Sequence, residues 1–505
     1  MPGTAASPIA SPLPAPNLPG TSRAGAGRLS HACARLALGV LLALVAAPAA
    51  ADLPPFAEPT FLIETLRVEG LGRASSELIL SESLLEAGTR YGESELKQAV
   101  FRIQRLPFVL DASFAIEKGS ERGSYVLVIR VEEIRRWFFG EDARITVFTN
   151  SVAFDAFAGQ DFSASLSPQV GFRFYTGRYG VFFASIAGNQ GLQLGYTRYN
   201  LLDRRIVLSA GFTPSGCCPV ETFSLGLDPT FSSWQTDESR SEIRLALGVP
   251  LGQRTSLQLE ATGSFSEQGR RRNLLGLDSN RAELDFFDRA HGDLRLSLTY
   301  DSSDDPVFPT TGVRAIGTLG FEGLESDFAV GGSNALFPFP RIEVPAELED
   351  GLPTFESRLW RLSASVEQHW ALSRRLTVSL SARLAAGVGR LENLPIVEQV
   401  RDCPPVDFDC RPSALRLIGG EDLEVFESLL TAGLSADVWG PRRTRRYGDF
   451  RFEAALEFGY DRTSPSLDLE DNPLYRKGIL TSLVFRNEWG LFRLSFDILD
   501  FGNGL

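Results

Sequence analysis

Apolar and polar side chains alternate with a period of two along most of the chain after about residue 138. In residues 376–388 every second side chain is Leu, Val or Ala, and Thr, Ser and Arg occupy positions between them. A period of two gives an extended strand two different faces. The same alternation recurs in residues 243–249, 257–265, 294–300, 452–458 and 492–496. The pattern predicts a series of long β-strands.

Strands of a soluble β-sandwich also alternate apolar and polar side chains. Two features of these strands favour a membrane barrel instead, namely their length and the charge on their polar face. The strands approach the roughly nine to eleven residues that cross a bilayer when tilted. Charged side chains on the polar face suit a wet lumen. The residues concerned are Arg361, Glu367, Arg383, Glu453 and Arg493.

The length of this region sets the expected number of strands. A closed barrel satisfies its backbone hydrogen bonds in lipid without any helix. At roughly 23 residues for each strand with its connection, the region accommodates about sixteen strands, an even number, as barrels of this kind require. We therefore expect residues 138–505 to form an all-β transmembrane antiparallel barrel.

The N-terminus has the pattern of a secretory signal. Arg28 and Arg35 precede an apolar run over residues 36–51, which ends in small residues before Asp52. Such a run with a small-residue cleavage pattern is typical of a signal peptide. It is too short, and too interrupted by Gly and Pro, for a spanning helix. We expect residues 1–51 to be a signal peptide; a retained membrane anchor is the alternative.

Residues 58–134 have a different organisation, strand–helix–helix–strand–strand. In the second helical segment, Leu96, Val100 and Ile103 fall on one face, and acidic residues occupy the first turn. Gly88 stands where the first helix is expected to end. The pattern predicts a small α+β domain ahead of the barrel, and a plug or a spacer is its simplest role.

The segment DSSDDPVFPTTG, residues 301–312, interrupts the alternation. Its two prolines, Pro306 and Pro309, cannot donate to a sheet ladder, and its aspartates can hydrogen-bond their own backbone. We expect a short, polar turn, which the family resemblance described below places on the periplasmic side. A calcium site or an acid–base cluster is the alternative, but nothing nearby supplies further ligands in a recognisable spacing.

The net charge and the cysteine spacings indicate which binding partners and which disulfides to expect. The net charge is −13, which disfavours duplex nucleic acid as a partner. Cys403 and Cys410 enclose a short segment, so in an exported protein we expect a disulfide between them. Cys217 and Cys218 are adjacent, and each either pairs elsewhere or stays free. The cysteine spacings do not predict a zinc site.

The chain has little that predicts catalysis. It contains no G-x-S-x-G motif, and a serine hydrolase would depend on His291 or His369 alone. We therefore expect neither enzymatic activity nor a cofactor or metal. The basic clusters 270–272 and 442–446 are interpreted as solvated loop charge, with binding of lipopolysaccharide phosphates as the alternative.

Residues 58–134 resemble a single POTRA domain, the periplasmic polypeptide-transport-associated module. The resemblance is carried by Leu66, Val68 and Gly70, by Gly88, Tyr91, Glu95 and Leu96, by the LPFV segment 106–109 and by the closing VLVIRVEE. It implies an exposed strand edge to which unfolded or nascent polypeptide clients can add. It also implies possible periplasmic accessory proteins as partners.

The barrel region resembles the BamA-type superfamily of outer-membrane assembly and translocation barrels, also called the bacterial surface antigen family. The resemblance is carried by YTRYNLLDRRIVLSAGF at 196–212, by the turn residues Asp301, Asp304, Pro309 and Gly312, and by ARLAAGVGRLENLP followed by LIGGEDLEVFE. It implies a protein that assists insertion, assembly or translocation of polypeptides, in contact with outer-membrane lipids and lipopolysaccharide. The alternative is a passive channel or structural barrel without insertase activity.

The sequence departs from this family in one motif. Members usually carry an Arg-Gly-aromatic triplet after a double glycine in an inward-folded sixth loop. Here Gly419 and Gly420 are followed by Glu424, Val425 and Phe426 at the triplet's place. The resemblance implies Asp437 and Glu457 as the acidic lumen partners of the triplet. If the loop folds inward, Glu424 faces like charges unless a lumen arginine such as Arg383 or Arg416 intervenes.

Overall fold

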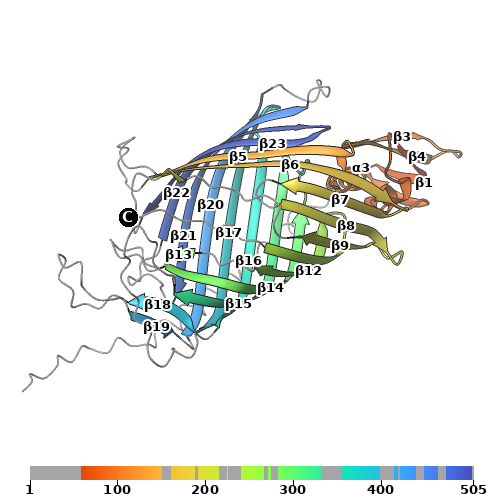
Figure 1. Cartoon of the computed structure of the whole chain (residues 1–505). Coiled ribbons are helices and arrows are strands. Elements are labelled where there is room, and N and C mark those ends of the chain that lie inside the picture. The colour runs from red at the N-terminus through yellow and green to blue at the C-terminus, as the bar shows by residue number, and fades with distance from the viewer. Residues whose placement is uncertain are drawn as a thin grey trace, which may run out of the picture.

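The computed structural model describes residues 59–149, 161–187, 191–214, 224–225, 240–266, 271–273, 283–330, 354–398, 414–418, 421–438, 448–464 and 474–502. Within these residues the chain forms a small α+β domain and a large β-barrel (Figure 1). The expected signal peptide lies outside the described residues, and so do Cys403 and Cys410, the expected disulfide pair.

The N-terminal domain is a four-stranded sheet with two helices. Its elements are β1 (Thr60–Glu69), α2 (Ser76–Ser83), β2 (Thr89–Gly92), α3 (Glu93–Gln104), β3 (Val109–Lys118) and β4 (Ser124–Glu133). The strand order is β2-β1-β4-β3, in which β1 and β4 are parallel and the other pairs are antiparallel.

The predicted apolar face of the second helix forms the core of this domain. Leu96 and Ile103 of α3 are fully buried, and Val100 is 5% exposed. Ser75 caps α2, because its hydroxyl accepts a hydrogen bond from the amide of Leu78 at 3.1 Å. The domain therefore has a hydrophobic core of its own beneath the sheet.

The predicted end of the first helix was wrong. The helix α2 ends at Ser83, and Leu84 adopts a left-handed conformation with φ 57°. Gly88 then donates its amide to the carbonyl of Ile63 at 2.7 Å and leads into β2, an edge strand that the sequence pattern did not predict. A four-residue edge strand is too short to show a period, so its pairing depends on β1.

The barrel sheet contains seventeen strands in the described residues, of which β10 (Ser224–Leu225) and β13 (Arg271–Asn273) are very short. The long strands are β5 (Trp137–Thr149), β6 (Asp161–Thr176), β7 (Gly180–Ala187), β8 (Gly191–Leu201), β9 (Ile206–Thr213), β11 (Arg240–Pro250), β12 (Thr255–Ser266), β14 (Glu283–Asp301), β15 (Gly312–Val330), β16 (Phe355–Ala371), β17 (Leu376–Glu392), β20 (Glu421–Asp437), β21 (Asp449–Ser464), β22 (Leu474–Asn487) and β23 (Gly490–Gly502). A separate hairpin, β18 (Leu394–Glu398) and β19 (Ala414–Ile418), follows β17.

The sheet closes by pairing its last strand with its first. The strands β23 and β5 are parallel, in a continuous register from Gly490 opposite Phe139 to Asp500 opposite Thr149. Every other neighbouring pair in the barrel is antiparallel among the described residues. The expectation of about sixteen strands is confirmed. Fifteen long strands lie within the described residues, and with this odd number the first and last strands run in the same direction.

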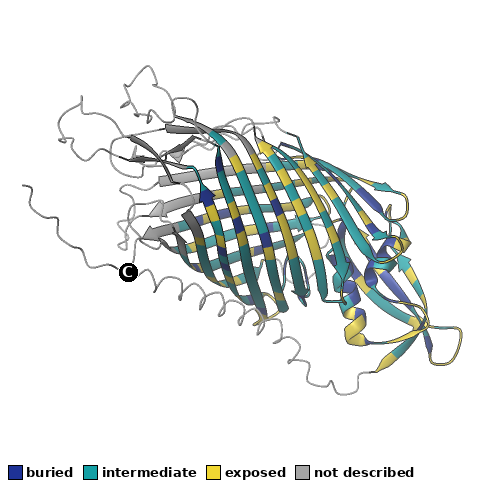
Figure 2. Cartoon of the chain, turned by 90° about the horizontal axis from the view of Figure 1, so that it is seen from below, coloured by how far each residue is buried: buried dark blue, intermediate teal, exposed yellow. Residues whose placement is uncertain are grey.

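The outer surface of the barrel is apolar. Leu294, Leu380 and Leu456, on three different strands, are 49%, 43% and 50% exposed, although all three are large hydrophobic side chains. Exposed residues alternate with less exposed ones along the strands (Figure 2). An apolar face turned outward on a closed barrel is the arrangement expected in a bilayer. Among the described helices, neither is long and apolar enough to cross a membrane.

The N-terminal domain packs against one end of the barrel, which we call the domain end (Figure 1). Phe108 of the domain contacts Tyr175 of β6 and Tyr199 of β8, with ring centroids 5.6 and 6.4 Å apart. Tyr199 and Val181 of the barrel belong to the same buried cluster as the domain core. The two units therefore share one hydrophobic interface.

Candidate functional site: a turn across the barrel mouth

The segment 301–312 connects β14 to β15 at the domain end, and its aspartates hold its backbone. Each aspartate accepts hydrogen bonds from amides further along the chain, at 2.7 to 3.0 Å. These bonds run from Ser303 to Asp301, from Val307 and Phe308 to Asp305, and from Thr310 and Thr311 to Asp304. Side chains used in this way replace the sheet ladder that the prolines interrupt.

Gly312 allows the segment to re-enter the sheet. Its φ is +109°, and a Cβ at this position would lie 2.5 Å from the carbonyl oxygen of Ser302. A residue with a side chain is strained in this conformation and lacks space here. The return into β15 therefore depends on glycine.

Asp305 binds an arginine on a distant strand. Its two carboxylate oxygens accept hydrogen bonds from Nη1 and Nη2 of Arg486 on β22, both at 2.9 Å. Burial raises the pKa of the Asp305 carboxyl, but the hydrogen bonds and charge of Arg486 outweigh it and leave the pKa below its ordinary value. Arg486 also binds Asp449 at 2.9 Å, so one guanidinium joins two carboxylates.

Phe308 lies between two guanidinium groups. The Cζ atoms of Arg451 and Arg486 are each 4.9 Å from the centre of its ring. Arg451 also donates to the carbonyls of Phe308 and Pro309, at 3.2 and 3.1 Å, and to Asp437 at 2.8 Å. The two guanidinium groups over the ring add cation–π attraction to these hydrogen bonds.

The same segment is bound by the N-terminal domain. Arg105, which caps α3, places its Nε 2.9 Å from Oδ2 of Asp301. Its Nη2 donates to the carbonyls of Asp301 and Ser303, at 3.2 and 3.1 Å. One domain arginine therefore holds the beginning of the segment, while two barrel arginines hold its middle.

These contacts require the segment to cross the inside of the barrel. In the sheet, β15 and β21 are separated by β16, β17 and β20, so residues 302–311 reach β21 and β22 across the lumen. On β21 the apolar Phe452 and Leu456 are exposed outward, which places Arg451 on the lumen face. We call residues 302–311 the strap.

The strap is a turn at the domain end of the barrel, and it is buried although its sequence is polar. Phe308 is 6% exposed and Asp305 is 9% exposed. The carboxylates are engaged by amides and arginines, and in the part of the chain that is described no group of His, Cys, Asp or Glu side chains is arranged to hold a metal ion. The segment is buried because arginines from the far wall and from the domain enclose it.

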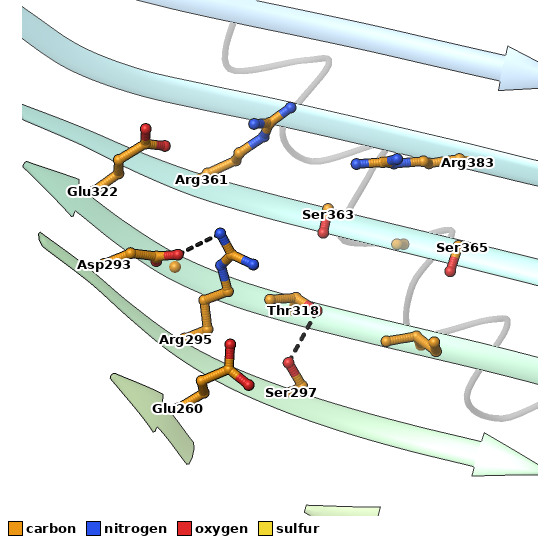
Figure 3. Close-up of a pocket in the computed structure, with 13 residues that line it drawn as sticks. Glu260, Asp293, Arg295, Ser297, Thr318, Glu322, Arg361, Ser363, Ser365 and Arg383 are labelled. Carbon is orange, nitrogen blue, oxygen red and sulfur yellow. Dashed lines mark hydrogen bonds and ion pairs between the residues drawn. The ribbon is translucent and has the colours of Figure 1, made fainter. Parts of the chain in front are cut away.

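The lumen wall formed by β12 and β14–β17 is polar. A hollow of about 390 Å³ is lined by side chains of β12, β14, β15, β16 and β17, among them Arg295, Arg361 and Arg383 (Figure 3). Asp293 pairs with Arg295, and Ser297 hydrogen-bonds to Thr318 at 3.2 Å (Figure 3). The alternation that predicted a charged lumen face thus places these residues together.

The sixth-loop residues are arranged differently from the expectation. Gly419 and Gly420 lie outside the described residues. Glu424 and Phe426 are part of β20, where Glu424 is exposed and Phe426 contacts Tyr460 with ring centroids 5.9 Å apart. Both share the outward face with the exposed Leu430 and Leu434. Glu424 therefore lies in a strand and not in an inward-folded loop, so the condition under which it would face the lumen acids is not met.

The two expected acidic partners are also far apart. Asp437 lies opposite Arg451 in the β20–β21 register, whereas Glu457 lies opposite Thr431. Six strand positions between Arg451 and Glu457 correspond to about 20 Å. Asp437 binds Arg451 at the domain end, and Glu457, 5% exposed, lies in the middle of β21.

The arginines of the strap site were missed at the sequence level. Arg451 occupies the polar face of a predicted strand, so its position toward the lumen was readable. Its contact with Phe308 could not be predicted, because the two residues are 143 positions apart in the sequence. Arg105 and Arg486 carry no sequence signal beyond their charge.

Comparison with known proteins identifies the barrel. Residues 162–399 match the profile described as the Omp85 superfamily domain. The chain carries an Omp85 superfamily barrel. The resemblance to outer-membrane assembly and translocation barrels is thereby confirmed, and the Omp85 barrel is located in the outer membrane. The N-terminal α+β sheet is consistent with one POTRA domain, so the domain end of the Omp85 barrel is its periplasmic end.

Solved structures with a similar arrangement have low sequence identity to the chain. BamA from Haemophilus ducreyi lacking POTRA domains 1–3 is 12% identical, with 86% of this chain and 80% of that chain covered and a TM-score of 0.35. CdiB from Escherichia coli is 15% identical, with 85% and 70% covered and a TM-score of 0.39. No curated protein sequence matches the chain.

Proposed function

We propose that this protein handles polypeptides at the outer membrane, assisting their insertion, assembly or translocation. The N-terminal domain receives an unfolded client from the periplasm and passes it to the barrel. Omp85 family members are generally transporters or insertases and not enzymes. Outer-membrane lipids surround the apolar belt, and lipopolysaccharide and periplasmic accessory proteins complete the proposed partners.

The observation that carries this proposal is the outer edge of β3. In the order β2-β1-β4-β3, the strand β3 pairs with β4 on one side, and its other edge has no strand partner among the described residues. Ser113 and Glu117 are exposed on it. A row of unpaired backbone groups is a template for an added strand, and an extended client supplies one.

A passive channel or structural barrel is the second candidate, and the barrel seam favours it. The β23–β5 register is continuous, and Arg144 of β5 lies 3.3 Å from Asp497 of β23. A seam that is fully paired and joined by an ion pair presents no free edge at which the wall could accept a client strand.

Depletion of the protein in its own cell, followed by quantitative proteomics of the outer membrane, separates the two candidates. Loss of other barrel or surface proteins supports polypeptide handling and indicates the clients. An unchanged outer-membrane proteome supports the channel or structural role.

A photo-crosslinking residue placed on β3 tests the edge itself. We expect crosslinks to unfolded polypeptides from position 113, because its side chain is exposed on the unpaired strand. Lys97, exposed on α3 and away from this edge, is the matched control position. Equal crosslinking from both positions would show that the edge does not select clients.

A further inference from the structure

Polar contacts at the periplasmic mouth of the barrel join the domain and the strap to several of its strands and turns. On one side the domain reaches the barrel turns. Glu86 binds Arg205 at 2.7 Å, and Gln253 donates to the carbonyl of Ser83 at 2.9 Å. On the other side, the strap continues from β14 to β21 and β22. Domain and strap meet at Arg105 and Asp301.

The strap's attachment to the far wall differs from that of a strand. It has no ladder with β21 or β22 in the described residues, and it is held by Arg451 and Arg486 through hydrogen bonds, an ion pair and the Phe308 ring. Contacts of this kind separate without disrupting any barrel strand. Pro306 and Pro309 within the strap cannot donate to neighbouring ladders, and Gly312 turns the chain back into β15 where the strap ends.

The lumen between β12 and β17 is suited to water. The lumen wall carries Arg295, Arg361 and Arg383 together with acidic and hydroxyl side chains, and the hollow among them holds about 390 Å³. An aqueous lumen that ends in a segment held by side-chain contacts can conduct ions once that segment leaves.

We propose that the strap is a releasable gate that closes the periplasmic mouth of the lumen and opens when the N-terminal domain moves away. Arg105 provides the coupling, because it holds Asp301 and the carbonyls that begin the strap. A domain pulled from the barrel withdraws Arg105 and weakens the strap's hold. This gate is independent of what the protein transports, and its test needs no client.

The test is the conductance of the full-length protein in a planar bilayer. Asp305→Asn removes the ion pair with Arg486, and we expect open probability to rise about tenfold to a hundredfold, as loss of a charge-assisted contact implies. Phe308→Ala removes the ring between the guanidinium groups and should act in the same direction. Arg105→Gln should give a smaller rise, because the contacts to β21 and β22 remain.

Arg383→Gln is the matched control, since it removes a lumen charge and leaves the strap contacts intact. It should change ion selectivity without changing open probability. Hydrogen exchange of residues 301–312, measured on the same samples, should rise in the Asp305 and Phe308 variants.

Three results would overturn the gate. The first is wild-type open probability in an Asp305→Asn protein that has assembled normally. The second is a rise in Arg383→Gln equal to that in Asp305→Asn. The third is failure of both strap variants to assemble, because a segment needed for assembly is structural and not releasable.

Discussion

Both sheets of this protein alternate apolar and polar side chains, but the apolar side chains face inward in the N-terminal domain and outward in the barrel. In the N-terminal domain, Ile63 and Ile129 are fully buried beneath the sheet. In the barrel, Leu296 and Leu380 are both 43% exposed, and they point away from the protein interior. The comparison shows that period two specifies two faces, while the medium on each side decides which face is the apolar one.

The largest expected effect is truncation of the domain core. Phe108 is fully buried, so Phe108→Ala should lower the free energy of unfolding of the domain by about 3–5 kcal/mol. Leu296→Ala on the lipid face should cost much less, because lipid fills the space. Denaturant unfolding of the full chain, with hydrogen exchange to follow each region, measures both. Equal losses would contradict the difference between the two apolar faces.

A charge placed on each face of one barrel strand sharpens the comparison. Leu296→Arg should cost about 2–4 kcal/mol of folding free energy in lipid vesicles. Ser297→Arg, one residue further and on the lumen face, should be close to neutral, because its side chain enters the polar hollow. Equilibrium folding into vesicles is the measurement. Equal stability of the two variants would show that β14 does not have one face toward lipid and the other toward the aqueous lumen.

A smaller effect is expected from the backbone where the strap enters β15. Gly312→Ala should cost about 1–3 kcal/mol, because φ is +109° and the carbonyl of Ser302 occupies the space of a Cβ. Gly323→Ala, on the same strand with nothing within 4 Å, is the control. The stability of both variants can be measured by gel electrophoresis, as the temperature at which the barrel changes from its folded to its unfolded mobility. A control as unstable as Gly312→Ala would exclude the steric explanation.

The smallest expected effect is a pH dependence of the strap. The pKa of Asp305 is lowered, so its contribution to stability is present above the ordinary value of about 3.9 and is lost as the pH falls below it. Arg486, which binds Asp305, also binds Asp449, and both residues are present in every variant. The stability difference between wild type and Asp305→Asn should therefore shrink below about pH 4. A difference independent of pH would contradict this origin.

Much of the fold followed from the sequence because it rests on local periodicity. The face of Leu96, Val100 and Ile103, the alternating barrel strands and the charged lumen were all predictable from neighbouring residues. The edge strand β2 and the exact number of barrel strands were not, since both depend on which strand pairs with which. Odd or even closure is a property of the whole sheet and has no local signal.

The candidate site was less predictable than the fold. The aspartates and prolines of 301–312 indicated a turn, but its burial depends on Arg486, which is 181 positions from Asp305. Glu424 was assigned to a loop from resemblance alone, although the alternation around it is that of a strand. The burial of 301–312 therefore depends on a distant contact, whereas the strand at Glu424 could have been predicted from local alternation.

The parallel seam has a mechanical consequence. Its hydrogen bonds are slanted, and parallel pairs are slightly less stable per residue than antiparallel ones. Every other described junction in the barrel is antiparallel, so the β23–β5 junction should least resist a force that pulls neighbouring strands apart. Lateral tension in the membrane, or a bulky segment forced through the lumen, should separate β23 from β5 before any other pair of strands. The Arg144–Asp497 ion pair should be the last contact to break at this junction.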